Sequence, residues 1–270
     1  VFLSLNDMGK DLPDYEEIPV ELSLSTEIQE EYNRIEKNLI SIIRHDKKAA
    51  RKIMSKYLQL LSTYPEQPYN QDPVIHPIYK DKENPIITPR DTAAPEDLSE
   101  KDLATLDIVE RKVKNGERVL IYTNWVKLDT QEKLKKLLSD KGYKTEILRV
   151  NVPPDKRETW VEDKVEKGLD VLITNPALVE TGLDLNAFTT LVYYNIGYNL
   201  FTFRQSSRRS WRINQTAPRV EVYMLYYKGV MQERALKLMA SKLAVATIIE
   251  GNLSDEGLAA MSECQDMTTL

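Results

Sequence analysis

The chain has 270 residues, of which 41% are hydrophobic and 29% charged, and its formal net charge is −5. This acidity excludes a protein that bulk positive charge holds to nucleic acid, but it leaves room for a few local phosphate contacts. Cys264 is the single cysteine, so no disulfide can form within the chain, and we expect a cytoplasmic protein. The two histidines lie far from Cys264 in the sequence, which argues against a zinc site.

The first 63 residues are predicted to be a helical segment. Apolar residues recur at steps of four and three from Ile28 to Ile42, which predicts a helix over 25–44 opened by a capping box at Thr26. A second helix is expected over 46–63. The chain begins at Val1 without a signal-peptide pattern, and no apolar run approaches the ~20 residues that span a bilayer. We therefore expect a piece of a longer protein with no membrane segment.

The composition changes at Tyr64. Seven of the thirteen prolines, and no glycine, fall within 64–98. Proline lacks a backbone donor and interrupts helices. This stretch is therefore predicted to be an extended or partly disordered connector.

Periodic patterns return over 99–250. Apolar runs predict strands at 118–123, 143–150, 170–174, 190–194 and 219–225. Helical patterns alternate with them, from Leu103 to near Gly116 and over 129–141, 154–168, 199–213 and 231–249. This alternation indicates an α/β domain with a mainly parallel sheet, followed by a tail over 251–270. Ligands of such sheets bind where strands lead into loops, so we expect a site at 124–128, 175–185 and the turn into residue 205.

The sequence QSSRRSWRINQ, residues 205–215, gathers three arginines and is named the arginine segment. Gln205, Arg209 and Arg212 are spaced by four and three, which places them on one face of the predicted helix. Guanidinium groups directed to one point repel each other unless an anion lies between them, and each can bind a phosphate group through two hydrogen bonds. The segment therefore predicts a polyphosphate site. The alternative is a solvated basic face that pairs with nearby acids.

Two other segments precede the arginine segment. VLIYTNW (119–125) ends a strand in polar residues and Trp125, and TNPALVETGLDL (174–185) follows a buried strand with Gly182 and Asp184. In this order the segments resemble the second RecA-like lobe of superfamily two helicases, most closely the Swi/Snf-like DNA-dependent ATPases. The arginine segment meets that family's spacing Gln-x3-Arg-x2-Arg-x2-Gln with Gln205, Arg209, Arg212 and Gln215. The resemblance covers 99–250 and extends more weakly over 7–35.

The resemblance implies a RecA-like (P-loop NTPase-type) sheet with flanking helices, and ATP bound between this lobe and a first lobe. It implies that Arg209 and Arg212 are arginine fingers, which stabilise charge on the transferred phosphoryl group. It implies roles on the ATP side for Gly182, Asp184 and Gln205. It also implies that strand-end loops contact the nucleic-acid backbone through Thr123, Asn124, Trp125, Thr174 and Asn175.

The phosphate-binding part of such an enzyme is absent from the sequence. A phosphate loop needs Gly-x4-Gly-Lys-Ser/Thr, and the single Gly-Lys, Gly9–Lys10, has Ser4 five positions before its glycine. The acidic pair Asp255–Glu256 follows no apolar strand, so it receives no metal-binding role. We expect a missing first lobe to hold Mg²⁺ and the ATP phosphates, and these 270 residues to be inactive alone. The expected partners are that lobe and double-stranded DNA, ahead of RNA.

Three alternatives were weighed against this interpretation. A non-enzymatic interaction module would not need both finger arginines, and both are present. A Rossmann-type enzyme needs a glycine-rich turn after its first strand, and YTNWVKLD contains no glycine. An RNA-directed superfamily two helicase stays open beside the DNA-directed one.

Overall fold

The computed structural model describes residues 12–124, 129–179 and 182–250. In chain order its helices and strands are β1 (Asp14–Leu22), α1 (Thr26–His45), α2 (Lys47–Thr63), α3 (Glu100–Lys114), β2 (Val119–Tyr122), α4 (Thr130–Asp140), β3 (Thr145–Leu148), α5 (Arg157–Glu166), β4 (Val171–Thr174), β5 (Thr190–Tyr193), α6 (Leu200–Ser207), β6 (Arg219–Tyr227) and α7 (Met231–Glu250). Short 3-10 helices span Pro154–Lys156 and Pro176–Leu178. None of the helices in the described ranges combines the length and the apolar character needed to cross a membrane.

The chain divides into two compact units, which are described separately. The sheet unit comprises Val1–Val20, Asp102–Tyr226 and Ala235–Leu270, and the helical unit comprises Glu21–Lys101 and Tyr227–Arg234. Each unit buries its own cluster of hydrophobic side chains. The division groups residues 64–98 with the two N-terminal helices, whereas the sequence predicts a separate connector there.

The sheet has six parallel strands in the order β1-β6-β5-β2-β4-β3. β2 lies between β4 and β5 and pairs with both along its whole length. At the edge, β1 runs parallel to β6: the amide of Asp14 donates to the carbonyl of Pro218, and the amide of Lys228 to that of Leu22, each at 2.9 Å. The predicted parallel RecA-like sheet is thus confirmed.

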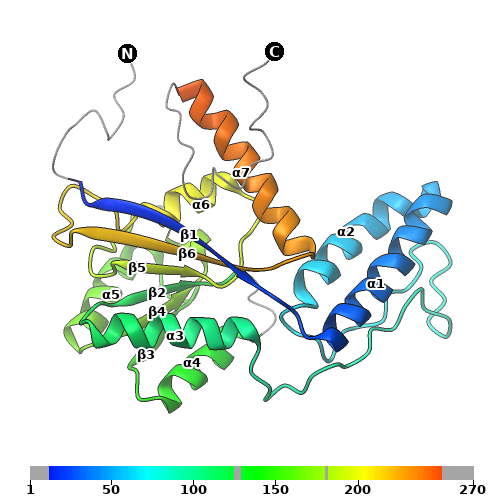
Figure 1. Cartoon of the computed structure of the whole chain (residues 1–270), viewed down its shortest axis with the longest axis horizontal. Coiled ribbons are helices and arrows are strands. Elements are labelled where there is room, and N and C mark those ends of the chain that lie inside the picture. The colour runs from blue at the N-terminus through cyan, green and yellow to red at the C-terminus, as the bar shows by residue number, and fades with distance from the viewer. Residues whose placement is uncertain (1–11, 125–128, 180–181, 251–270) are drawn as a thin grey trace. The chain divides into compact units, whose positions relative to one another are not determined.

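The central strands are apolar on both faces because helices cover both. β2, β4 and β5 read VLIY, VLIT and TLVY, and each is buried throughout. Continuous apolar runs are expected of a parallel sheet between two helical layers. Figure 1 shows α6 and α7 on one side of the sheet and α3 and α4 on the other. Leu120 and Tyr122 belong to the core on the α6 side.

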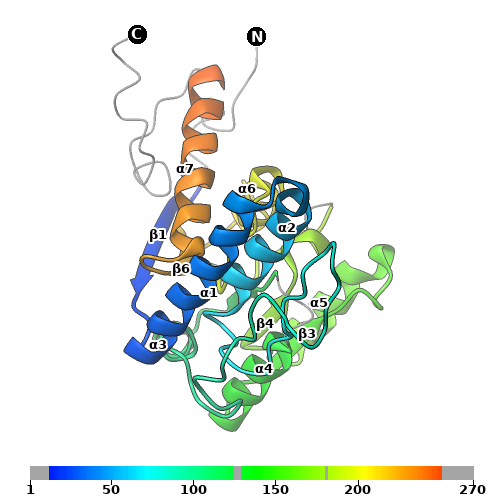
Figure 2. The same cartoon turned by 90° about the vertical axis from the view of Figure 1, so that its right-hand side faces the viewer.

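In the helical unit, α1 and α2 form an antiparallel hairpin joined at Asp46. Figures 1 and 2 show the two helices side by side. The Asp46 side chain accepts hydrogen bonds from the amides of Lys48 and Ala49 at 2.9 Å and so caps α2. Capping satisfies backbone donors that the first turn of a helix leaves free.

The proline-rich stretch 64–98 contains no helix or strand, as its composition predicts, apart from an antiparallel bridge between Val74 and Ile87. It is nevertheless more than a connector. Tyr64, Val74 and Ile87 are buried in the core of the helical unit. The Tyr64 hydroxyl also donates to the carbonyl of Arg90 at 3.0 Å. The prediction of an extended connector missed these apolar anchors, which lie between the prolines.

Two features near the N-terminus differ from prediction. The cap of α1 is Ser25, whose side chain accepts a hydrogen bond from the amide of Ile28 at 3.4 Å, and not Thr26. Residues Asp14–Leu22 form a strand, although the sequence analysis assigned 1–63 to a helical segment. This acidic stretch has weak strand propensity of its own, and its pairing with β6 decides its conformation.

The helix of the arginine segment ends earlier than predicted. α6 stops at Ser207, whereas the pattern predicts helix to residue 213. The Tyr122 hydroxyl donates to the carbonyl of Ser206 at 3.0 Å. That carbonyl is the acceptor that the amide of Ser210 would use in a continued helix. Arg209 and Arg212 therefore lie beyond the helix, and the predicted helical face of Gln205, Arg209 and Arg212 is wrong.

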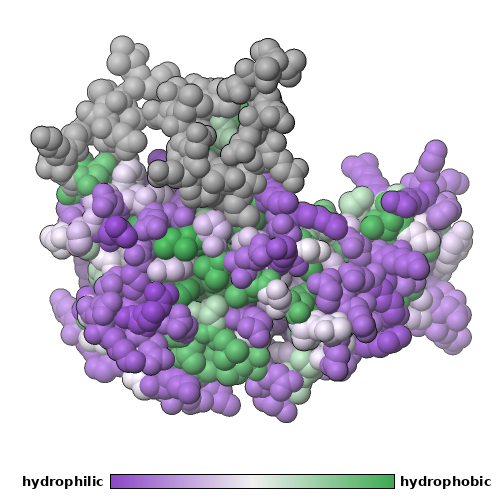
Figure 3. Space-filling model, viewed as in Figure 1, coloured by the Kyte–Doolittle hydropathy of each residue, from purple (hydrophilic) through white to green (hydrophobic). Residues whose placement is uncertain are grey.

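The face of the molecule drawn in Figure 3 is mainly hydrophilic, with hydrophobic groups gathered in patches between the polar ones. A mixed surface of this kind is ordinary for a folded protein. The exposed large hydrophobic residues include Phe201 and Ile213. Both line the hollow described next.

Candidate functional site

A surface hollow in the sheet unit lies beside α6 and the arginine segment. Its volume is about 840 Å³. Four arginines and one aspartate among its lining residues give the lining a formal charge of +3, whereas the whole chain carries −5. The lining comprises Asp184, Leu200, Phe201, Arg204, Gln205, Arg208, Arg209, Trp211, Arg212, Ile213 and Asn214. Positive charge concentrated in a concave site attracts anions.

Hydrogen bonds attach the arginine segment to the loop that contains Gly182 and Asp184. The amide of Leu185 donates to the carbonyl of Arg209 at 3.3 Å. The Ser210 hydroxyl donates to the carbonyl of Leu185 at 3.1 Å. The two segments, whose bonded residues Leu185 and Ser210 are 25 positions apart in sequence, therefore form one wall of the hollow.

Two contacts orient the predicted finger arginines. Arg212 Nη1 lies 2.7 Å from Asp184 Oδ1 in an ion pair whose side chains are 36% and 39% exposed. Arg209 Nη2 donates to Gln205 Oε1 at 3.5 Å. The structure thus brings together Arg209, Arg212, Gln205 and Asp184 in one hollow, even though they do not share a helical face.

Gly182 adopts a φ of +73°, in the left-handed region that favours glycine. A Cβ added at this position would meet no atom within 4 Å. In the described residues, glycine is therefore needed here for its backbone conformation rather than for close packing.

The predicted nucleic-acid residues at the strand ends differ in exposure. Thr123 and Thr174 are fully buried. The Thr174 hydroxyl donates to the carbonyl of Leu148, and the Thr123 hydroxyl accepts from Gln131 Nε2, each at 3.0 Å. Both hydroxyls therefore bond within the protein and are not exposed at the strand-end surface, and their contact with nucleic acid stays a prediction. Trp125 lies outside the described residues.

Three asparagines meet at the carboxyl ends of β2, β4 and β5. The amide of Asn124 donates to Asn195 Oδ1 at 2.6 Å, and Asn124 Nδ2 donates to the carbonyl of Asn195 at 2.7 Å. Asn175 Nδ2 donates to the carbonyl of Asn124 at 3.4 Å. Asn124 and Asn175 are partly exposed, so among the predicted contact residues that the structure describes they are the ones available to a ligand at this edge.

Comparison with known proteins identifies the domain. Residues 100–214 match the family of helicase conserved C-terminal domains. These residues resemble the C-terminal helicase lobe of Swi/Snf-type ATPases. The chain is 29% identical over 167 residues to the chromatin-remodeling ATPase INO80 of Mycosarcoma maydis, covering 60% of this chain and 8% of that protein. It is 27% identical over 146 residues to the ATP-dependent DNA helicase DDM1 of Arabidopsis thaliana, covering 53% of this chain and 19% of that protein.

Solved structures share the fold of the lobe. The C-terminal part of the Fun30 ATPase domain matches with a TM-score of 0.60 and 16% identity over 84% of this chain and 90% of that one. A Sulfolobus solfataricus SWI2/SNF2 ATPase core in complex with double-stranded DNA matches with a TM-score of 0.58 and 18% identity over 93% of this chain and 50% of that one. The chain spans less than a tenth of the length of its INO80 relatives.

Several residues of the lobe's site were missed by the sequence analysis. Asn195 follows the apolar run of β5 as Asn124 follows that of β2, so the same strand-end rule could have found it. The Tyr193 hydroxyl lies 2.5 Å from the Ser206 hydroxyl and so links β5 to α6. No sequence signal marks this tyrosine, because it occupies an ordinary apolar strand position.

Gln215, the last residue of the family spacing, has an internal role. Its Nε2 donates to the carbonyls of Asn186 and Ser210 at 2.9 and 3.0 Å, and its Oε1 accepts from the amide of Ala217 at 3.1 Å. The side chain is buried. Gln215 therefore fixes the end of the arginine segment and does not line the hollow.

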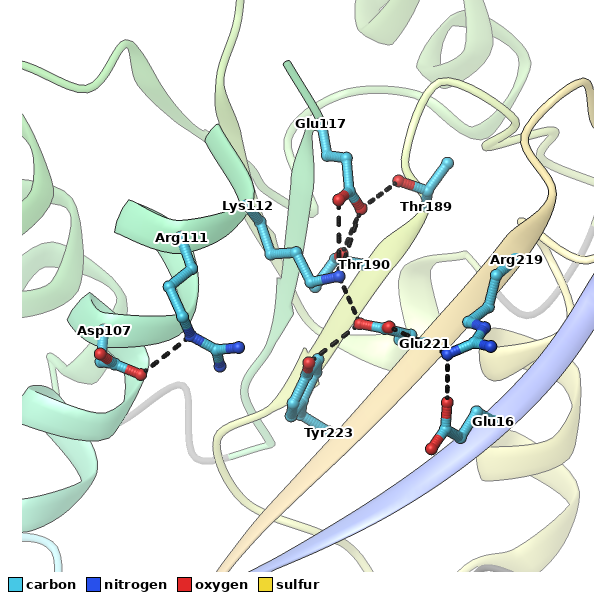
Figure 4. Close-up of polar contacts among 10 residues, drawn as sticks. All are labelled: Glu16, Asp107, Arg111, Lys112, Glu117, Thr189, Thr190, Arg219, Glu221 and Tyr223. Carbon is cyan, nitrogen blue, oxygen red and sulfur yellow. Dashed lines mark hydrogen bonds and ion pairs between the residues drawn. The ribbon is translucent and has the colours of Figure 1, made fainter. Parts of the chain in front are cut away.

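At the amino ends of the strands, the lobe carries a second polar cluster, named the amino-edge network (Figure 4). Lys112 forms ion pairs with Glu221 and, at 3.5 Å, with Glu117. The hydroxyls of Thr189 and Thr190 donate to Glu117 at 3.0 and 3.1 Å. The network also contains Glu16, Asp107, Arg111, Arg219 and Tyr223. Acids and bases alternate here, so its charges are neutralised within the protein.

Metal ligands do not gather among the described residues of this lobe. In the ranges that the structure describes, no group of three or more His, Cys, Asp or Glu side chains could hold a metal ion. The carboxylates at the hollow and at the amino edge pair instead with arginine and lysine.

Proposed function

We propose that this lobe is half of an ATP-driven DNA translocase and that its hollow supplies arginine fingers to ATP hydrolysis. The observation that carries the proposal is the lining of the hollow. Four arginines gather there, although the net charge of the whole chain is negative. Like charges so placed repel one another until an anion enters. A triphosphate is an anion of matching size and charge for planar guanidinium groups.

Arg209 and Arg212 are the proposed fingers. Each guanidinium can donate two parallel hydrogen bonds to phosphoryl oxygens, where negative charge develops in the transition state. Their backbone is held to Leu185 on the neighbouring loop. A fixed backbone keeps the guanidinium groups at the reacting phosphate without reorganisation during the reaction.

Asp184 and Gln205 are proposed to orient the side chains of the two finger arginines before ATP binds. Asp184 pairs with Arg212 at 2.7 Å, and Gln205 accepts from Arg209 at 3.5 Å. The Asp184 pair is partly exposed and hence weak. A phosphate group could therefore replace the carboxylate as the partner of Arg212 when the cleft closes.

The first lobe of the enzyme must supply the phosphate loop that this sequence lacks. No phosphate loop occurs in the 270 residues. We propose that a first lobe binds the ATP phosphates together with Mg²⁺, and that closure against this lobe drives movement along DNA. The support for DNA is the relation to an ATP-dependent DNA helicase and the fold shared with an ATPase core in complex with double-stranded DNA. Asn124 and Asn175 are the proposed contacts to its backbone, since amide groups can bind phosphate without net charge.

The proposal is tested by alanine variants of the three neighbouring arginines in the whole protein that carries this lobe. Arg209→Ala and Arg212→Ala should each lower kcat by about 10³-fold or more, because a finger acts in the transition state. The KM for ATP should change far less. Lysine at either position should restore little, since a point charge cannot reproduce the bidentate contact. Steady-state ATPase kinetics with DNA present measure these effects.

Arg208→Ala is the matched control. Arg208 lines the same hollow but is the C-cap of α6, outside the finger spacing. Its replacement should lower kcat much less. The 270-residue chain alone should hydrolyse no ATP above background. Normal turnover of Arg209→Ala and Arg212→Ala, or a larger loss in Arg208→Ala, would contradict the finger assignment.

A further inference from the structure

Trp211 lies between the two proposed finger arginines and contacts strand β1. Its Nε1 donates to the carbonyl of Pro13 at 2.7 Å. Its ring lies 5.4 Å from that of Tyr15, tilted by 51°. On its other side, Arg208 Cζ lies 5.6 Å from the ring centroid. The indole thus joins the arginine segment to residues nearly two hundred positions earlier in the chain.

β1 is a firm support for this contact. The amide of Asp14, between Pro13 and Tyr15, donates to the carbonyl of Pro218 at 2.9 Å, which fixes the strand to the edge of the sheet. Glu16 pairs with Arg219 of β6 at 3.0 Å. Tyr15 packs against the core, and this burial raises the pKa of its hydroxyl well above the ordinary value. The partner of Trp211 is therefore a neutral, well-packed part of the sheet.

The arginine segment needs such support because it is not helical. α6 ends at Ser207, so the places of Arg209 and Arg212 depend on side-chain contacts and turns. Ser210 and Gln215 attach the segment on the side of the loop 182–186. Trp211 attaches it on the side of β1. Removal of one attachment leaves the segment free to shift relative to the hollow.

We propose that Trp211 is a positioning residue that ties the finger segment to β1, so that the strand leading into this lobe holds Arg209 and Arg212 in place. The inference rests on the proposed function of the two arginines. It adds that the indole N–H, and not only the ring, is required. A displacement of about 1 Å in a catalytic group can lower a rate by about a hundredfold, so the loss of one anchoring hydrogen bond has a measurable effect.

The test uses Trp211→Phe, which keeps an aromatic ring but cannot donate to Pro13. Trp160→Phe is the matched control, because Trp160 is a half-buried tryptophan on α5 whose ring faces Lys164 at 5.4 Å, away from the hollow. In the whole protein, Trp211→Phe should lower kcat on the order of tenfold with little change in the KM for ATP. In the 270-residue chain it should speed deuterium exchange of the Asp14 amide on the order of tenfold, since a local opening governs that exchange. Trp160→Phe should leave both unchanged.

Each outcome decides the inference. If the Asp14 amide of Trp211→Phe exchanges as in the parent chain, Trp211 does not anchor β1. Faster exchange with normal kcat means that the anchor does not position the fingers, and the inference fails. An equal loss of kcat in Trp160→Phe would indicate general loosening of the core. Arg209→Ala is measured beside them: if it too turns over normally, the proposed function has failed, whereas its loss beside a normal Trp211→Phe overturns only this inference.

Discussion

The hollow and the amino-edge network differ in how their charged side chains are paired. The hollow is lined by four arginines and one aspartate, and the ion pair between Arg212 and Asp184 is more than one-third exposed on both sides. In the amino-edge network, Lys112 lies between Glu117 and Glu221, with the Lys112 side chain 12% exposed (Figure 4). The first region places a net positive charge in a concave, partly exposed surface. The second neutralises its charges internally and so contributes to stability.

The pKa of Glu221 reflects this internal pairing. Burial alone would raise the pKa of the Glu221 carboxyl, but hydrogen bonds from Lys112 and Tyr223 and the charges of Lys112 and Arg219 hold it below its ordinary value. Burial and the nearby Glu221 in turn raise the pKa of Tyr223 to about 12. The ionised carboxylate is therefore the form that this network stabilises.

The largest expected effect is the difference in free energy of unfolding between the variants Lys112→Met and Arg212→Ala. Lys112→Met should lower the free energy of unfolding by about 2–3 kcal/mol, because two partly buried carboxylates lose the Lys112 counter-charge. Arg212→Ala should change it by less than about 1 kcal/mol, since its pair with Asp184 is exposed. Urea denaturation followed by circular dichroism measures both.

Lys114→Met is the control for the helix itself. Lys114 lies on α3 like Lys112, but its pair with Glu110 is exposed, so the substitution should have little effect. Equal losses for Lys112→Met and Arg212→Ala would remove the distinction between the two regions. The hollow would then be a structural ion-pair site.

A smaller effect on stability is expected from substitution of Gln215. This residue belongs to the arginine segment, but its side chain bonds within the protein, as the side chains of the amino-edge network do. Gln215→Ala should lower the free energy of unfolding by about 1–2 kcal/mol, because three buried or partly buried backbone groups lose their partner. Gln205→Ala, in the same segment but partly exposed, is the control and should cost less. If Gln215→Ala leaves stability unchanged yet abolishes turnover, Gln215 is a site residue and its internal role is wrong.

The smallest expected effect is a dependence on pH. Because the folded-state pKa of Glu221 lies below that of the unfolded chain, its ionised form contributes stability above the ordinary carboxyl range. That contribution is lost as the pH falls through the lowered folded-state pKa. Urea denaturation between neutral and acidic pH should show a weaker fall of stability in Glu221→Gln than in the parent chain. Identical pH profiles would show that Glu221 is not held as a carboxylate by this network.

Local patterns in the sequence were sufficient for the central strands and for the ends of several helices. β2, β4 and β5 are short apolar runs. Such runs are typical of strands in a parallel sheet that is covered on both faces, so they can be recognised without knowledge of the rest of the fold. Gly116, Gly142 and Gly168 follow predicted helices, and each has a positive φ. A glycine at such a position ends a helix through its own backbone freedom. These features depend only on neighbouring residues, so sequence alone determined them.

Contacts between distant residues decided the rest. At the end of α6, a hydroxyl on β2 bonds to the Ser206 carbonyl that a continued helix would use, and β1 is a strand because β6 pairs with it. Thr174 is a polar residue, but it is buried in the fold, where its hydroxyl donates to the carbonyl of Leu148. The sequence determined which residues take part in the arginine site. Only the tertiary structure decided how they converge, because the Tyr122 hydroxyl and the hydrogen bond from Trp211 to Pro13 act across 84 and 198 residues of chain.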